Sequence, residues 1–181
     1  FVSTGHGPLT DPHALEAMRL INGNLVQMIA NPADIALREQ IMLGSMQAGL
    51  AFSNAILGAV HAMSHSLGGY LDLPHGVCNA VLVEHVVAFN YDAAPDRYRI
   101  VAETLGIDSR GLSHRQVRER LVQHLIDLKQ RIGFRETLSL HGVNLSDIPF
   151  LSQHAMQDPC ILTNPRSSTQ RDVEVVYAEA L

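Results

Sequence analysis

The sequence has few cysteines, few charged residues and no dense cluster of basic ones. Its 181 residues include two cysteines, Cys78 and Cys160, and only 17% are Asp, Glu, Lys or Arg. Two thiols so far apart favour reduced cysteines in a cytoplasmic protein over a disulfide framework. A net charge of −5 without a basic cluster argues against nucleic-acid binding. A hydrophobic content of 46% excludes disorder, and the length suits one ordinary domain.

The longest uncharged stretch, residues 40–71, contains no Asp, Glu, Lys or Arg. Its length would allow a membrane span, because about 20 apolar residues suffice. The stretch also carries several polar side chains, among them Gln47, Asn54, His61 and His65, which a lipid-facing helix does not tolerate. We therefore expect central helices that are covered on all sides by protein, and no membrane association. No signal-peptide or lipidation motif is visible.

Helix start signals recur along the chain, and strand signals do not. Thr10-Asp11-Pro12 precedes one periodic apolar run, and Asn31-Pro32 is expected to start another. Ser113-His114-Arg115-Gln116 has the pattern of a capping box. The expected helices run over about 11–28, 32–52, 55–69, 76–90, 95–105, 114–132, 149–157 and 170–181. The valines of 76–90 favour a strand by propensity, but their alternation is poor. The sequence therefore predicts an all-α bundle of seven to nine helices.

The first five residues, Phe1 to Gly5, resemble the last turn of a helix that ends at a glycine cap. On this interpretation the body of the helix lies before Phe1. We therefore expect the chain to be a fragment of a longer protein.

Three histidines predict a metal site. His61 and His65 are four residues apart, so on a helix they project from nearly the same face. His75 follows Gly68-Gly69 and Leu73-Pro74, and a turn there could bring its ring back to the other two. Neutral imidazole is the commonest protein ligand for transition metals. The alternative is that these are core histidines. It stays open because the HxxxH pair lacks the glutamate of the metalloprotease motif, which would have supported a metal site.

Several motifs at this spacing resemble the iron-containing (group III) alcohol dehydrogenases. The motifs are Gly49-Leu50-Ala51-Phe52-Ser53-Asn54-Ala55, His61-Ala62-Met63-Ser64-His65-Ser66-Leu67-Gly68-Gly69, Leu73-Pro74-His75-Gly76-Val77-Cys78-Asn79-Ala80, Glu84-His85-Val86, Asp158-Pro159-Cys160 and Thr163-Asn164-Pro165-Arg166. The resemblance covers essentially the whole chain. It implies that residues 1–181 form the C-terminal all-helical domain of a two-domain dehydrogenase, and that the N-terminal α/β nucleotide-binding domain is absent.

The resemblance also implies roles for individual residues. In the family one Asp and three His hold the metal; His61 and His75 match two of these ligands, and the others are expected before Phe1. His65 matches a histidine beside the nicotinamide and the substrate, which implies catalytic and cofactor-binding roles. The implied cofactors are a divalent metal, Fe²⁺ or alternatively Zn²⁺, and NAD or NADP. Phe52 and Cys160 are candidate pocket-lining residues, although packing roles for both stay open.

The implied activity is the interconversion of small primary alcohols and aldehydes by a homo-oligomer, and we expect the isolated chain to be inactive. Two alternatives remain. One is a glycerol-dehydrogenase-like or dehydroquinate-synthase-like enzyme, against which the run Leu73-Pro74-His75-Gly76-Val77-Cys78-Asn79 argues. The other is a non-catalytic helical domain that associates with itself or a partner. Elsewhere, His85 is expected to be a core residue and Asp72 a turn residue.

Overall fold

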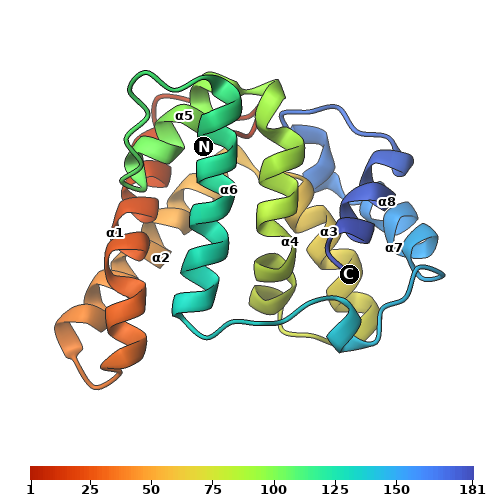
Figure 1. The fold of residues 1–181 in the computed structure, drawn as a ribbon, viewed down its shortest axis with the longest axis horizontal. Coiled ribbons are helices and arrows are strands. Elements are labelled where there is room, and N and C mark those ends of the chain that lie inside the picture. The colour runs from red at the N-terminus through yellow and green to blue at the C-terminus, as the bar shows by residue number, and fades with distance from the viewer. The chain divides into compact units, whose positions relative to one another are not determined.

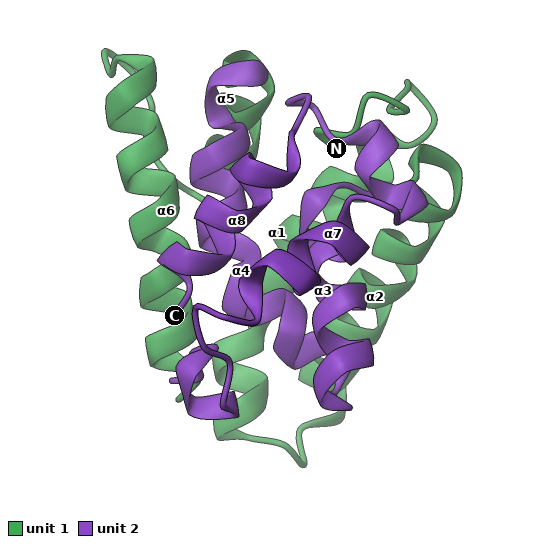
Figure 2. Ribbon diagram, turned by 90° about the vertical axis from the view of Figure 1, so that its right-hand side faces the viewer, with its two compact units in different colours: residues 1–56, 94–134 green, residues 57–93, 135–181 purple.

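The computed structural model describes residues 1–181 and contains eight α-helices and no strand (Figure 1). The predicted all-α fold is therefore confirmed. The helices are α1 (Asp11–Ala30), α2 (Ile35–Ala55), α3 (Ala59–Leu71), α4 (His75–Asn90), α5 (Pro95–Thr104), α6 (His114–Arg131), α7 (Ile148–Ala155) and α8 (Gln170–Glu179). Three 3₁₀ helices, η1 (Tyr91–Ala93), η2 (Ser139–His141) and η3 (Pro159–Thr163), lie between them. The chain divides into two compact units: residues 1–56 with 94–134, and residues 57–93 with 135–181 (Figure 2).

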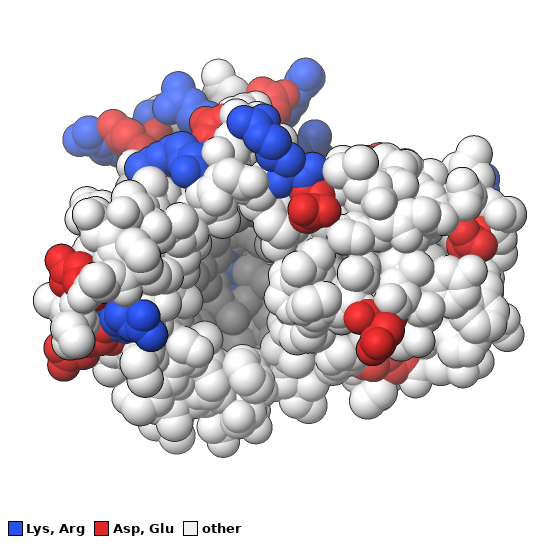
Figure 3. All heavy atoms as spheres, turned by 90° about the horizontal axis from the view of Figure 1, so that it is seen from below, with Lys and Arg blue, Asp and Glu red and all other residues white.

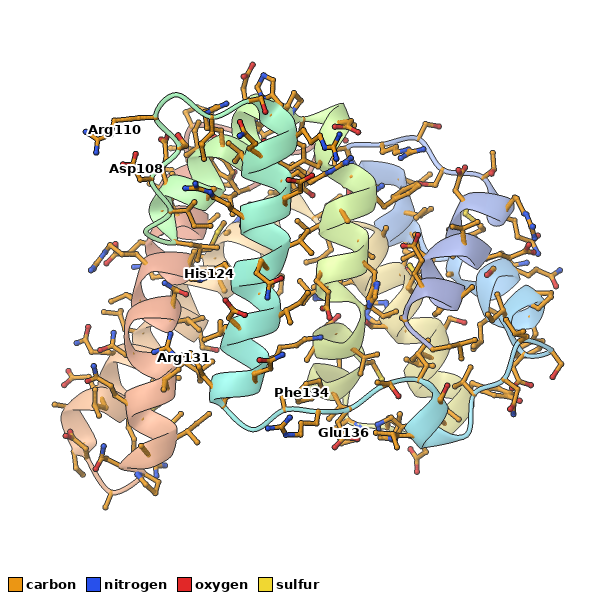
Figure 4. The ribbon with its side chains drawn as sticks, viewed as in Figure 1. Asp108, Arg110, His124, Arg131, Phe134 and Glu136 are labelled. Atoms are coloured by element: carbon orange, nitrogen blue, oxygen red, sulfur yellow. The ribbon has the colours of Figure 1, made fainter.

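Unit 1 is built on α1 and α2, which pack against each other, and adds α5 and α6. The approach of α1 to α2 requires a glycine: a Cβ at Gly44 would lie 2.8 Å from Cγ1 of Ile21. Asp108 and Arg110 pair at 2.8 Å in the loop before α6 (Figure 4). The capping box that was predicted at the start of α6 is present, with Ser113 as the N-cap residue.

Unit 2 holds α3, α4, α7 and α8, and its core lies among these helices. Met63, Leu67, Leu82 and Leu151 are almost completely buried there, as is the ring of Tyr177. The Tyr177 hydroxyl donates to the backbone oxygen of Met63 at 2.7 Å, which ties α8 to α3. A buried tyrosine needs such a partner, because an unpaired hydroxyl in an apolar core is costly.

The valine-rich segment forms the helix α4, as predicted, despite its strand propensity. Val81 and Val86 are buried, so the packing of α4 within unit 2 outweighs the weak intrinsic preference of valine for strands. The helix begins at His75, directly after Pro74. This start places the third histidine in the first turn.

Two predicted helix boundaries around α2 were wrong. The helix begins at Ile35 and not at Pro32, and its cap is Asp34, whose side chain accepts from the N–H of Leu37 at 3.1 Å. Asn31 instead ends α1, because its N–H bonds to the carbonyl of Gln27. At its other end α2 continues through Ser53-Asn54 to Ala55.

The histidine helix α3 extends beyond the predicted end at Gly68-Gly69. It continues to Leu71 and ends at Asp72, which adopts the left-handed conformation with φ 55°. The N–H of Asp72 bonds to the carbonyl of Gly68, so an aspartate takes the position that glycine usually occupies. The prediction that Asp72 is a turn residue is confirmed.

The interpretation of residues 1–5 as a helical turn was wrong. These residues form a non-helical turn, and Gly5 does not have a positive φ. The Ser3 hydroxyl donates to the carbonyl of Ala55 at 2.5 Å, and a Cβ at Gly5 would lie 2.8 Å from the same oxygen. Gly5 is therefore needed for the close approach of this segment to the end of α2, and not as a helix cap.

Charged side chains are sparse on the face drawn in Figure 3, and there the basic side chains lie beside acidic ones. No single helix is long and apolar enough to cross a membrane. The pair α2 and α3, taken together across the break between them, meets that test by length and composition only.

Candidate metal centre and active site

Three histidine rings converge within unit 2. The ring centroids of His61 and His75 are 5.2 Å apart, those of His65 and His75 are 5.1 Å apart, and those of His61 and His65 are 6.1 Å apart. The spacing of four residues on α3 places His61 and His65 on one face, as predicted. The turn after Leu71 and the start of α4 at His75 bring the third ring back to them.

The distance between the ring centroids of His61 and His75 fits two ligands of one ion. With a metal–nitrogen bond of about 2.1 Å, the ring centroid of a ligand lies about 3.2 Å from the ion, so two ligands at octahedral to tetrahedral angles have centroids about 4.5–5.2 Å apart. The observed 5.2 Å lies at the tetrahedral end of that interval. The donor set, two imidazoles, suits Fe²⁺ or Zn²⁺.

His61 is electrostatically suited to bind a cation as a neutral ligand. Burial, followed by the neighbouring rings of His75 and His65, lowers the pKa of His61 to about 4. The imidazole is therefore unprotonated at neutral pH, which is the form that can coordinate a metal.

His75 has a close polar neighbour that the sequence did not indicate. The Nδ2 atom of Asn79, one turn further along α4, lies 2.8 Å from Nε2 of His75. A ring nitrogen that accepts a hydrogen bond is not free to hold an ion. An ion held by His75 must therefore displace the Asn79 amide from Nε2 or bind at Nδ1.

His65 is oriented by Asp158, which lies 93 positions away in the sequence. Nδ1 of His65 is 2.8 Å from Oδ2 of Asp158, and Oδ1 accepts from the backbone N–H of Cys160 at 2.8 Å. Burial alone would raise the pKa of Asp158, but the hydrogen bonds from Cys160 and His65 outweigh it and leave this pKa below its usual value. An ionised carboxylate only accepts, so Nδ1 of His65 carries the proton and Nε2 is the free acceptor.

Cys160 lies next to the same carboxylate. Its side chain is buried, and burial together with the hydrogen bond to Asp158 raises the pKa of the thiol to about 11. The thiol is therefore protonated at neutral pH. One donor atom from each of His65, Asp158 and Cys160 lies within 4.8 Å of the other two.

The other candidates from the sequence lie outside this cluster. Phe52 belongs to α2 in unit 1, and its side chain is 46% exposed. His85 on α4 was expected to be a core residue, but its side chain is only partly buried. Its Nε2 lies 3.8 Å from a carboxylate oxygen of Glu84. Sequence reasoning assigned no role to Asp158 or Asn79. Asn79, four residues after His75, could have been found from helical spacing, whereas Asp158 had no local signal.

The fold and the three convergent histidines define a helical, candidate metal-binding domain. The profile of the C-terminal part of the Fe-containing alcohol dehydrogenase family matches residues 1–181, and the chain therefore belongs to this family. This confirms the resemblance that the motifs indicated.

Curated relatives and solved structures agree with this assignment. The chain is 37% identical to 1,3-propanediol dehydrogenase of Klebsiella pneumoniae over 99% of its length and 46% of the relative. It is 39% identical to NAD-dependent methanol dehydrogenase of Bacillus methanolicus, over all of this chain and 48% of the relative. The alcohol dehydrogenase from Oenococcus oeni superimposes with a TM-score of 0.96 at 34% identity, over 99% of this chain and 47% of that one. The chain thus spans about half the length of the relatives that it matches.

Proposed function

We propose that this chain is the metal-binding half of an NAD(P)-dependent alcohol dehydrogenase that interconverts small primary alcohols and aldehydes. The convergence of His61, His65 and His75 carries the proposal, because it gathers metal-ligand and proton-transfer groups in one place. The names of the relatives, which act on methanol or 1,3-propanediol, support the substrate class. A nucleotide-binding domain outside residues 1–181 would complete the enzyme.

In this proposal His61 and His75 hold a divalent metal, Fe²⁺ or alternatively Zn²⁺. Such an ion, when bound, lowers the pKa of a coordinated alcohol and polarises an aldehyde carbonyl. The burial that keeps His61 neutral supports its role as a ligand. Hydride transfer itself belongs to the nicotinamide, and the protein supplies position and electrostatics.

His65 is proposed to take up the alcohol proton at Nε2. Asp158 supports this role in two ways. Its hydrogen bond to Nδ1 holds the ring of His65 in one orientation, and the negative charge of its carboxylate stabilises the imidazolium that forms. The same ring is proposed to contact the nicotinamide. Cys160, beside Asp158, is proposed to line the substrate pocket. A pocket-lining role for Phe52 stays a prediction from the family motifs. We also propose that the enzyme is a cytoplasmic homo-oligomer.

The test compares three histidine variants in the full-length protein. We expect His61→Ala and His75→Ala each to lose both bound metal and turnover. His65→Ala should retain the metal and lose about 10²–10⁴-fold in kcat, the usual contribution of general acid–base catalysis. Iron content by elemental analysis, after loading with Fe²⁺ alone, and NAD reduction with short primary alcohols are the two measurements.

The matched control is His154→Ala, an exposed histidine on α7 whose ring contacts Phe150 of the same helix. This variant should keep both metal and activity. Loss of iron in His65→Ala, or its retention in both His61→Ala and His75→Ala, would show that the ligands are assigned to the wrong residues.

A further inference from the structure

We infer that His65, Asp158 and Cys160 form a second cation site, which takes a thiophilic divalent ion such as Zn²⁺, Co²⁺ or Cd²⁺. The cluster offers one imidazole nitrogen, one carboxylate oxygen and one thiol sulfur, all within 4.8 Å of one another. Ligands of one tetrahedral ion with bonds of about 2.0–2.3 Å are separated by about 3.3–3.8 Å, so only small side-chain adjustments are required.

The charge of this donor set distinguishes it from the pair of His61 and His75. Once the thiol proton is displaced, Cys160 and Asp158 carry two negative charges, which neutralise a divalent ion. The two imidazoles of the pair carry none. Sulfur also selects for Zn²⁺, Co²⁺ and Cd²⁺ over Mg²⁺ and Ca²⁺, which prefer oxygen.

Hydrogen bonds hold the segments that carry the three donors in place. Asp158 is the N-cap residue of η3, and its Oδ1 is fixed by the N–H of Cys160. The Thr163 hydroxyl at the other end of η3 donates to the carbonyl of Leu57, just before α3. The segments that carry the three donors are therefore tied together without the ion, which reduces the entropic cost of binding.

Binding is a substitution at the sulfur. The S–H bond of Cys160 breaks, its proton goes to solvent, and a metal–sulfur bond forms in its place. His65 stays neutral, because its single ring proton moves from Nδ1 to Nε2 as Nδ1 binds the ion. Burial favours the protonated thiol, but a coordinated thiol loses its proton to the ion. Three protein ligands leave the fourth position to water, and the 43% exposure of the His65 side chain gives the ion a path from solvent.

The test is a Co²⁺ titration of the 181-residue chain, because a cobalt–thiolate bond gives a near-ultraviolet charge-transfer band that imidazole ligands do not give. We expect one band that saturates at one Co²⁺ per chain, disappears when Zn²⁺ is added and is unaffected by excess Mg²⁺. Cys160→Ser should abolish the band. The matched control, Cys78→Ala, removes the other buried cysteine and should retain it.

Two further variants separate this site from the metal centre of the proposed function. The double variant His61→Ala/His75→Ala should keep the band, whereas His65→Ala, which leaves the sulfur in place, should weaken Co²⁺ binding at least tenfold. Circular dichroism checks that each variant is folded. A band that survives in Cys160→Ser, that depends on Cys78, or that is lost with His61 and His75 would overturn the inference, as would bound Co²⁺ without any band. An ion at this site leaves the proton of His65 on Nε2, so it would compete with the proton uptake proposed for that atom. The titration follows the cobalt–sulfur band and not turnover, so its failure would leave the proposed function untouched.

Discussion

Asn164 connects the elements that carry the site, and its replacement should destabilise unit 2 strongly. Its Oδ1 accepts from the N–H of Ala59 at 3.0 Å and from Nδ2 of Asn90 at 2.7 Å. Its Nδ2 donates to Oδ1 of Asn90 and to the carbonyl of Arg166, both at 2.8 Å. All four hydrogen-bonding positions of the amide are therefore used, in a side chain that is only 6% exposed.

The expected cost follows from the groups that lose their partners. Asn164→Ala removes four hydrogen bonds and leaves the Ala59 N–H and both ends of the Asn90 amide without these partners in a buried site. At roughly 1 kcal/mol for each bond, with an added penalty for unpaired buried groups, we expect a loss of about 3–5 kcal/mol. That is a large part of the total stability of a domain, which is about 5–15 kcal/mol.

Urea unfolding followed by circular dichroism measures this loss. Asn164→Asp should be nearly as destabilising as the alanine variant, although it conserves shape, because its second oxygen would face the oxygens of Asn90 and Arg166. The control is Asn54→Ala, which removes one exposed bond to the carbonyl of Leu50 and should cost less than about 1 kcal/mol. A double-mutant cycle between Asn90 and Asn164 should give a coupling of about 1–3 kcal/mol. A cost below 1 kcal/mol for Asn164→Ala, or full additivity in the cycle, would refute this reasoning.

Three other substitutions test packing and ionisation. Gly44→Ala should lower the free energy of unfolding by about 1–3 kcal/mol, because the new Cβ would lie 2.8 Å from Ile21. Gly49→Ala on the same helix meets nothing within 4 Å and should raise it by up to about 1 kcal/mol. Equal effects of the two substitutions in urea unfolding would contradict this. Tyr177→Phe should lower the free energy of unfolding by about 1 kcal/mol. Burial raises the pKa of Tyr177, so above about pH 10 only the unfolded chain releases this proton and the wild type should lose stability. The Tyr177→Phe variant should lose less stability over the same pH range. Burial lowers the pKa of His124 on α6 (Figure 4), so the wild type should lose stability below about pH 6.5, where the unfolded chain binds this proton more readily, and His124→Gln should flatten that dependence.

Helix caps and helix faces depend on a few neighbouring residues, and most of those could be predicted from local signals in the sequence. The capping box at Ser113 and the shared face of His61 and His65 are set within one helical turn, and both were predicted correctly. The start of α2 was predicted wrongly because two cap candidates, Asn31 and Asp34, lie close together. The carbonyl of Asn31 accepts from the N–H of Asp34 in a turn between the helices, and a helix starting at Pro32 would leave no room for that turn.

Contacts across long stretches of sequence could not be predicted in this way. His65 and Asp158 are 93 positions apart, and Asn90 and Asn164 are 74 apart. Nothing near Asp158 distinguishes a carboxylate that orients a histidine from one that only caps a short helix, and it does both. The family motifs included Asp158-Pro159-Cys160, but only the folded structure shows which residue the carboxylate meets.

The candidate metal centre and the proposed thiophilic site both lie within unit 2, and this determines which experiments can examine them. Their donors come from α3, the start of α4 and the segment around η3, and the buried Asn164 amide links the beginning of α3 to the residues that follow η3. Neither donor set includes a residue of unit 1. Metal binding measured on the 181-residue chain therefore reports on these donors directly. Alcohol turnover requires in addition a nicotinamide held opposite the substrate, so a chain that binds metal without turnover agrees with both proposals.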